Sequence, residues 1–152
     1  MIYAFLANGF EETEAIVPID LIRRCEKDLV TVGVGGQIIP VFADIEEREI
    51  VLDENLEMII LPGGMPGTIN LEKSEYVQKA VDFCVENNIP IASICAAPSI
   101  LGHKGLLDGK KACCYTGYNT QLGNAIYDAD AKLCVVGIII IARRACVALV
   151  SF

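Results

Sequence analysis

The chain of 152 residues is predicted to fold as an α/β protein, a three-layer α/β/α sandwich around a mostly parallel sheet. Short runs of apolar, β-branched residues alternate along the chain with stretches of helical periodicity, which is typical of a parallel sheet with helices on its faces. Hydrophobic residues make up 53% of the chain and charged residues 21%, so it can bury a substantial core. We expect one domain over residues 1–152.

The first half of the chain contains two predicted helices between apolar strands. The first helix should run from near Glu11 to about Arg24, with acidic residues in its first turn, where the helix dipole favours them. Ser74 can cap the second helix, which should end near Asn88. The predicted buried stripe of the second helix is Val77, Ala80, Val81, Cys84 and Val85. The predicted strands are Ile2–Ala7, Leu29–Val34, Ile38–Phe42, Glu49–Leu52 and Met58–Leu61.

Cys95 lies where a further strand is predicted to turn into a helix. The apolar run from Ile89 to Ile94 indicates a buried strand, and Pro98 suits the first turn of a helix. A sharp strand-to-helix turn can present one nucleophilic atom, and the amides that open the helix would stabilise a thiolate there. Two later strand regions are predicted, the second with a turn or bulge at a glycine: Lys111–Tyr115 and Val135–Ile141.

Composition excludes several classes of partner. A net charge of −8 argues against binding nucleic acid, which requires clustered Lys and Arg. The apolar stretch from Leu133 to Val150 is broken by Arg143 and Arg144, so no membrane span is expected. The apolar residues at the N-terminus lack a basic flank and are too few for a signal peptide, which leaves the cytoplasm as the expected location.

The seven cysteines show no metal-binding pattern. They form no Cys-x-x-Cys pair and the chain has one histidine, so no metal and no other cofactor is expected. Adjacent Cys113 and Cys114 should point to opposite faces of a strand, which disfavours a disulfide between them. The cysteines with apolar neighbours are expected to be reduced core residues: Cys25, Cys84, Cys134 and Cys146.

Three segments should meet outside the carboxyl ends of the strands, where open parallel sheets place their sites. Together they supply a thiol, carboxylates and a glycine loop with free amides, the parts of a nucleophile, a proton carrier and an oxyanion site. The glycine loop is no phosphate loop, because it lacks the Gly-Lys-Ser/Thr ending. Each part alone is common in proteins without activity, and it is their order that is informative. The segments are Asn8–Glu14, Leu61–Gly67 and Ile94–Ala96.

These segments resemble the ThiJ/PfpI superfamily, which includes the parkinsonism-associated protein deglycases. The resemblance covers most of the chain up to about residue 117 and implies a flavodoxin-like sheet of the class I glutamine-amidotransferase type, with a nucleophile elbow. The stretches that carry it are Gly9-Phe10-Glu11-Glu12-Thr13-Glu14, Ile60-Leu61-Pro62-Gly63-Gly64, Ala92-Ser93-Ile94-Cys95-Ala96-Ala97-Pro98 and Gly105-Leu106-Leu107-Asp108-Gly109-Lys110-Lys111.

The resemblance implies that Cys95 is the nucleophile and Glu14 its carboxyl partner. Gly63, Gly64 and Ala96 would offer backbone amides to a substrate oxygen. An ionised Glu14 would raise the pKa of the Cys95 thiol, whereas a protonated Glu14 can donate a hydrogen bond to the thiolate and lower it. We therefore expect Glu14 to be neutral when Cys95 is reactive.

Histidine, the usual activator of a catalytic thiol, is not available in the expected place. His103 comes eight residues after Cys95, about 12 Å along a helix, and is interpreted as a helix-end residue. Many relatives carry a histidine on the following strand, where this chain has Tyr115. A tyrosine, with a pKa of about 10, can position a substrate oxygen but is a poor base. Peptidase or amidotransferase-like hydrolase activity is therefore disfavoured.

The remaining chemistry needs one thiol and one carboxyl group. The resemblance implies a cofactor-independent glyoxalase or deglycase that acts on α-oxoaldehydes such as methylglyoxal, or on their protein adducts. Two alternatives stay open: a thiol-based oxidative-stress sensor or chaperone, and an inactive copy that serves as an interaction surface. Relatives continue after their last strands with a glycine-rich loop and a long helix, whereas this sequence stops at Phe152. This chain is therefore expected to leave one face of the sheet incompletely covered. Either a partner subunit covers that face, as in a homodimer, or the sequence is incomplete.

Overall fold

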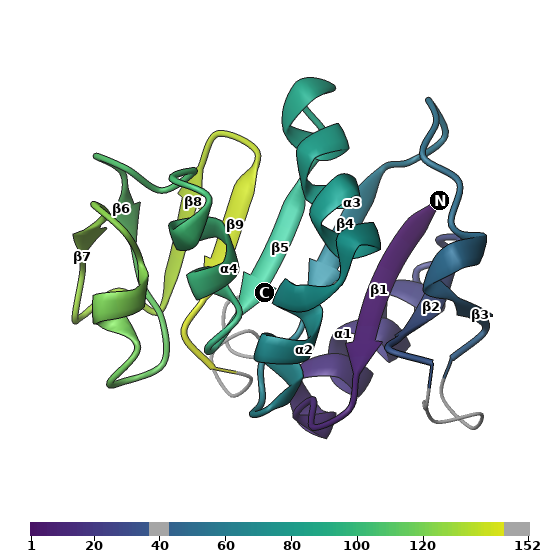
Figure 1. Ribbon diagram of the computed structural model, residues 1–152, viewed down its shortest axis with the longest axis horizontal. Coiled ribbons are helices and arrows are strands. Elements are labelled where there is room, and N and C mark those ends of the chain that lie inside the picture. Colours follow the sequence, from purple (N-terminus) through teal and green to yellow (C-terminus); the bar gives the residue numbers. More distant parts are fainter. Residues whose placement is uncertain (37–42, 145–152) are drawn as a thin grey trace.

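A seven-stranded sheet forms the centre of the protein (Figure 1). The computed structural model describes residues 1–36 and 43–144. In this part of the chain all neighbouring strands of the sheet are parallel except β8 and β9, and their order is β3-β2-β1-β4-β5-β9-β8. The predicted mostly parallel architecture is confirmed. The strands are β1 (Ile2–Ala7), β2 (Leu29–Val34), β3 (Ile45–Glu46), β4 (Met58–Leu61), β5 (Ile91–Ile94), β8 (Leu133–Val136) and β9 (Ile139–Ala142).

Helices cover both faces of the sheet (Figure 1). Because side chains alternate along a strand, β1 contributes to two cores and every one of its residues is buried. Its Ile2, Ala4 and Leu6 pack with α1 on one face, and its other residues pack with α3 on the opposite face. None of the helices in the described ranges is long and apolar enough to cross a membrane. The helices are α1 (Glu12–Arg24), α2 (Gly67–Lys73), α3 (Glu75–Glu86) and α4 (Pro98–His103).

The region before β4 differs from the sequence prediction. Glu49–Leu52 is not a strand, because a 3₁₀ helix, η1 (Glu47–Glu49), ends there and the chain continues without regular structure. The Glu49 carboxylate accepts the Glu46 amide at 2.7 Å and so closes a capping box that favours the turn. The short strand β3 was not predicted. The predicted strand Ile38–Phe42 lies outside the described residues.

The helical predictions are mostly confirmed, with errors at particular positions. Ser74 caps α3 and accepts the Val77 amide at 3.2 Å. Four residues of the predicted buried stripe of α3 are buried, but the fifth, Val85, is exposed. Cys25, at the end of α1, was predicted to be a core residue and is also exposed. Helix α2 was missed because it has only seven residues and its N-cap, Pro66, makes no side-chain cap.

The second half of the chain forms shorter strands than predicted. Strand β6 (Lys111–Ala112) ends three residues before the predicted end and pairs with β7 (Ile126–Tyr127) in a separate two-stranded sheet. Strands β8 and β9 form an antiparallel hairpin whose turn contains Gly137 at φ 60°, as the glycine suggested. Leu133 and Val135 of β8 are exposed, on the face opposite the α3 layer.

The carboxyl ends of the central strands lie at the same edge of the sheet. Ala7 pairs with Val34, and Leu61 pairs with Ser93. The strand order runs outward in opposite directions from β1 and β4, which creates a topological switch point between them. Ligand sites in open parallel sheets lie at such points, so the segments that follow β1, β4 and β5 are candidates for function.

Candidate active site

Cys95 occupies the turn between β5 and α4 in a backbone conformation that is rare for residues other than glycine, with φ 63°. Two backbone hydrogen bonds fix it there. The Cys95 amide donates to the Ala142 carbonyl at 2.9 Å, and the Tyr115 amide donates to the Cys95 carbonyl at 2.8 Å. Pro98 opens α4, as predicted. The turn is therefore a nucleophile elbow held from both sides.

Glu14 reaches Cys95 from the first turn of α1. Glu11 caps this helix, because its carboxylate accepts the Glu14 amide at 2.8 Å, and the Glu11 amide donates to the Gly63 carbonyl at 3.1 Å. The Glu14 side chain is 4% exposed and lies in hydrogen-bonding contact with Cys95 and with the Gly63 amide. Its Oε2 atom has no hydrogen-bond partner within the described residues. One carboxyl oxygen therefore remains available inside a buried site.

Gly63 allows the thiol and the carboxyl group to approach each other. A Cβ atom at this position would lie 2.5 Å from Oε2 of Glu14 and 2.7 Å from Cβ of Cys95. Both distances are too short for a real contact, so no other residue fits without moving the pair. The next residue, Gly64, has φ 95°, and a Cβ atom there would lie similarly close to the backbone of Gly9 and Glu11. The glycine loop therefore packs directly against the segment that carries Glu14.

Substitution of Gly63 by alanine should separate Glu14 from Cys95. We expect the free energy of unfolding to fall by about 1–3 kcal/mol, because the added methyl group overpacks a buried site. Chemical denaturation measures the loss, and an unchanged denaturation midpoint would show that the close contact is absent.

Two backbone amides face the sulfur of Cys95, those of Ala96 and Gly64. Helix α4 contains six residues, so its dipole is short, and the amides themselves are the main electropositive groups near the sulfur. The structure thus brings together the sequence-predicted site residues Cys95, Glu14, Gly63, Gly64 and Ala96.

Tyr115 is placed differently from the other predicted site residues. Its backbone amide contacts Cys95, but the residue is 47% exposed. Through this backbone hydrogen bond, Tyr115 helps to hold the elbow.

Burial dominates the electrostatics of the Cys95–Glu14 pair. Burial and the contact with Glu14 raise the pKa of Cys95 to about 12, against the opposing effect of the Ala96 and Gly64 amides. Burial also raises the pKa of Glu14, and the charge of Glu11 adds to this, while the contacts with Cys95 and the Gly63 amide act in the opposite direction. Each ionisable group of the pair thus resists carrying a charge when the other is charged.

His103 is not part of this pair. It ends α4, as interpreted from the sequence, with its Nδ1 2.6 Å from Oε1 of Glu72 and its Nε2 3.0 Å from Oε1 of Gln121. Because it is the only histidine of the chain, an intrachain Cys–His dyad is ruled out in this conformation. The hydrogen bond with Glu72 raises the pKa of His103.

The His103–Glu72 contact should make stability depend on pH. A pKa raised above the unfolded value of about 6.5 means that the contact stabilises fully below that pH and is lost as pH rises through the folded pKa. We expect His103→Gln to lower the denaturation midpoint at pH 5.5 more than at pH 9. The effect should be small, because both side chains are partly exposed. An equal loss at both pH values would contradict this assignment.

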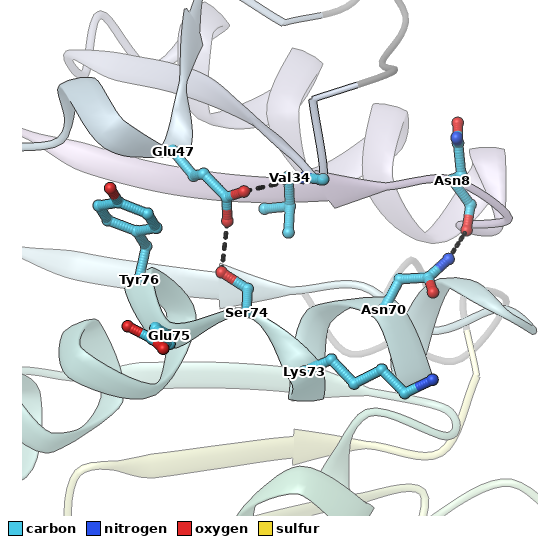
Figure 2. A pocket seen from close by; sticks show the side chains of 9 residues that line it. Asn8, Val34, Glu47, Asn70, Lys73, Ser74, Glu75 and Tyr76 are labelled. Carbon is cyan, nitrogen blue, oxygen red and sulfur yellow. Dashed lines mark hydrogen bonds between the residues drawn. The ribbon is translucent and has the colours of Figure 1, made fainter.

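Two hollows near α2 do not contain Cys95 or Glu14. One, of about 390 Å³, lies between α2 and α4 and includes His103 in its wall. The other, of about 450 Å³, is lined by the ends of β1 and β2 and by the turn between α2 and α3 (Figure 2). Figure 2 shows that two pairs of its polar groups are hydrogen-bonded: Asn70 donates to the Asn8 carbonyl at 2.9 Å, and Glu47 accepts from the Ser74 hydroxyl. In the described ranges no group of His, Cys, Asp and Glu is arranged to hold a metal ion.

A model of the DJ-1/PfpI family matches residues 1–152. The chain belongs to the DJ-1/PfpI family. Among curated relatives of the family, protein DJ-1 homolog B of Arabidopsis thaliana is 32% identical over 146 residues, which cover 91% of this chain and 33% of that protein. A deglycase of Pyrococcus abyssi is 29% identical over 140 residues, or 86% of this chain and 82% of the relative. The chain thus spans about a third of the Arabidopsis relative.

Solved DJ-1 structures have the same fold. Oxidized DJ-1 of Toxoplasma gondii superposes with a TM-score of 0.87 at 28% identity, covering 97% of this chain and 84% of that chain. This similarity confirms the DJ-1/PfpI architecture that the sequence motifs implied.

Proposed function

We propose that this DJ-1/PfpI protein converts α-oxoaldehydes such as methylglyoxal to 2-hydroxy acids at the Cys95–Glu14 pair, without a cofactor. One observation carries the proposal. A buried carboxyl group, with an oxygen that has no partner in the described part of the chain, contacts a thiol on a nucleophile elbow. A general acid–base group beside a nucleophile is the minimum that this isomerisation requires.

Addition of the thiol to the aldehyde is the first step. The Cys95 sulfur forms a bond to the aldehyde carbon, and the carbonyl π electrons move to oxygen, which takes up a proton to give a hemithioacetal. The amides of Gly64 and Ala96 can donate to the developing oxyanion. Glu14, which holds the proton of the reactive pair, donates that proton to the new hydroxyl group.

Glu14 then carries a second proton between adjacent carbons. Its carboxylate removes the proton of the former aldehyde carbon, which gives an enediolate, and returns it to the neighbouring carbon, while the hydroxyl proton moves from the first oxygen to the second. The product is a thioester of a 2-hydroxy acid on Cys95. Water hydrolyses this thioester, which releases lactate when the substrate is methylglyoxal and restores the thiol. The net reaction adds one water and needs no external oxidant or reductant.

The location of the proton in the resting pair follows from the donors around it. Burial raises the pKa of both Cys95 and Glu14, so the pair carries at most one negative charge. The sulfur faces two amides, those of Ala96 and Gly64, whereas the carboxyl group contacts one, that of Gly63. We therefore place the negative charge on sulfur and the proton on Glu14. This is the reactive form expected from the sequence.

Protein adducts of the same aldehydes are a second substrate class for this site. The Pyrococcus abyssi relative is named a deglycase, and the hemithioacetal chemistry also applies to a hemiaminal, once that adduct releases its aldehyde. Hydrolysis of peptides is not supported, because His103 binds Glu72 and Gln121 instead of Cys95.

The test is incubation of the purified chain with methylglyoxal, without glutathione and in the presence of a metal chelator. We expect catalytic formation of lactate, measured by NMR over many turnovers. Consumption of one equivalent of methylglyoxal with no lactate would overturn the proposal, because it would show that addition to the thiol is not followed by proton transfer.

A thiol-based oxidation sensor is the alternative function that the same pair supports. Oxidation of Cys95 to a sulfinate would place new oxygens beside the protonated Glu14, which could donate to them. Intact mass after mild peroxide treatment, with two added oxygen atoms mapped to Cys95, would favour this function if lactate formation is absent.

A further inference from the structure

A second group of thiols lies at the edge of the sheet, away from the Cys95–Glu14 pair. Cys134 belongs to β8 and pairs directly opposite Ile141 of β9. Cys113 follows β6, and its sulfur lies 3.5 Å from the Ile141 carbonyl oxygen. Both side chains belong to the same buried cluster and are in hydrogen-bonding contact with each other. Figure 1 shows β6 beside β8 at this edge of the molecule.

We propose that Cys113 and Cys134 are a redox modification site and form a reversible intramolecular disulfide. Both are free thiols in this structure. Cys134 from β8 and Cys113 from the segment after β6 converge on Ile141, which places their sulfurs together without a change of fold. Cys114 is not the partner, because its sulfur is directed to the carbonyl of its neighbour Tyr115, at 3.3 Å.

The two thiols differ in access, which fixes the order of the chemistry. Cys134 is 8% exposed and Cys113 is fully buried, so an oxidant meets Cys134 first. With a hydroperoxide as oxidant, the Cys134 sulfur attacks the terminal oxygen, the O–O bond breaks, and a sulfenic acid and an alcohol or water form. The Cys113 sulfur then displaces the sulfenic hydroxyl group. This step releases one water and forms the S–S bond.

Arg143 supports the second step. Its Nη2 donates to the Asp128 carbonyl at 2.8 Å, while its buried Nε has no hydrogen-bond partner in residues 1–36 and 43–144. Its positive charge lowers the pKa of Cys113, against the stronger effect of burial, which raises that pKa to about 12. Arg143 is thus a nearby positive charge that favours the thiolate form of Cys113, the attacking group in this step.

Peptide mapping tests this proposal on the full chain. Trypsin separates the two cysteines, since Cys113 lies in the peptide 112–132 and Cys134 in the peptide 133–143. After hydrogen peroxide and alkylation of free thiols, we expect a linked pair of these peptides, two hydrogens lighter than their sum and separated by dithiothreitol. Fragment ions of the wild-type peptide distinguish Cys113 from Cys114, so the result does not depend on a variant that folds poorly.

Variants provide the matched controls. Cys114→Ser should keep the linked peptides, and Cys134→Ala should abolish them. Alkylation of both cysteines after peroxide treatment, or a link that uses Cys114 in place of Cys113, would overturn the proposal. Oxygen addition at Cys95 increases the mass of its peptide, whereas a disulfide lowers the summed mass of two other peptides. The result of this test is therefore independent of the reactivity of the Cys95–Glu14 pair.

Discussion

Replacement of Cys95 by serine should reduce the rate of lactate formation from methylglyoxal by on the order of 10⁴-fold or more. Serine fills nearly the same volume, and its main-chain hydrogen bonds to Ala142 and Tyr115 can persist. The hydroxyl group, however, is hardly ionised at neutral pH and cannot replace the sulfur as a nucleophile. The measurement is the initial rate at saturating substrate.

Cys25→Ser is the matched control for the Cys95 variant, because Cys25 is an exposed thiol outside the site. It should retain the wild-type rate. Full activity of Cys95→Ser would mean that the aldehyde reacts elsewhere, and the account of the elbow would fail.

Glu14→Gln should lower the same rate by about 10²–10⁴-fold, the usual contribution of a general acid–base group. Glutamine keeps the shape of the side chain and can still donate to the sulfur. It cannot accept the proton of the hemithioacetal carbon and return it to the next carbon. The thiol should therefore still form an adduct with methylglyoxal, visible by intact mass, while lactate is lost.

Glu12→Gln is the control for Glu14→Gln. Glu12 lies in the same first turn of α1 but is exposed, so its substitution makes the same carboxyl-to-amide change without touching the pair. We expect wild-type rates from it. Equal losses in both variants would indicate a general effect of charge on α1 and would contradict the role assigned to Glu14.

The elements that form the site were predictable from local sequence. Strands such as Ile2–Ala7 are continuous apolar runs, and Pro98 marks the start of a helix after Cys95. The convergence of Glu14 with Gly63 follows from parallel topology, which places consecutive strand ends on one edge.

Other features depend on contacts that local sequence does not contain. The Ala142 carbonyl holds the elbow from β9, nearly fifty residues along the chain from Cys95. Strand β6 stops at Ala112 because its partner is the two-residue strand β7 and not the central sheet. The burial of Cys113 and Cys134 against one residue, Ile141, also requires the assembled hairpin. Contacts between segments that are distant in the sequence determine these three features.

The central claim is that Glu14 and Cys95 share one proton, which resides on Glu14 when the thiol reacts. The rate of Cys95 alkylation by iodoacetamide as a function of pH tests it most directly, in wild type, Glu14→Gln and Glu14→Ala, with the modified residue confirmed by peptide mapping. Burial raises the midpoint in all three proteins. Because a protonated Glu14 donates to the thiolate, we expect the wild-type midpoint to lie below that of Glu14→Ala, which has no donor, with Glu14→Gln between them. A wild-type midpoint above those of both variants, as an ionised Glu14 would give, or one midpoint shared by all three proteins, would contradict the claim.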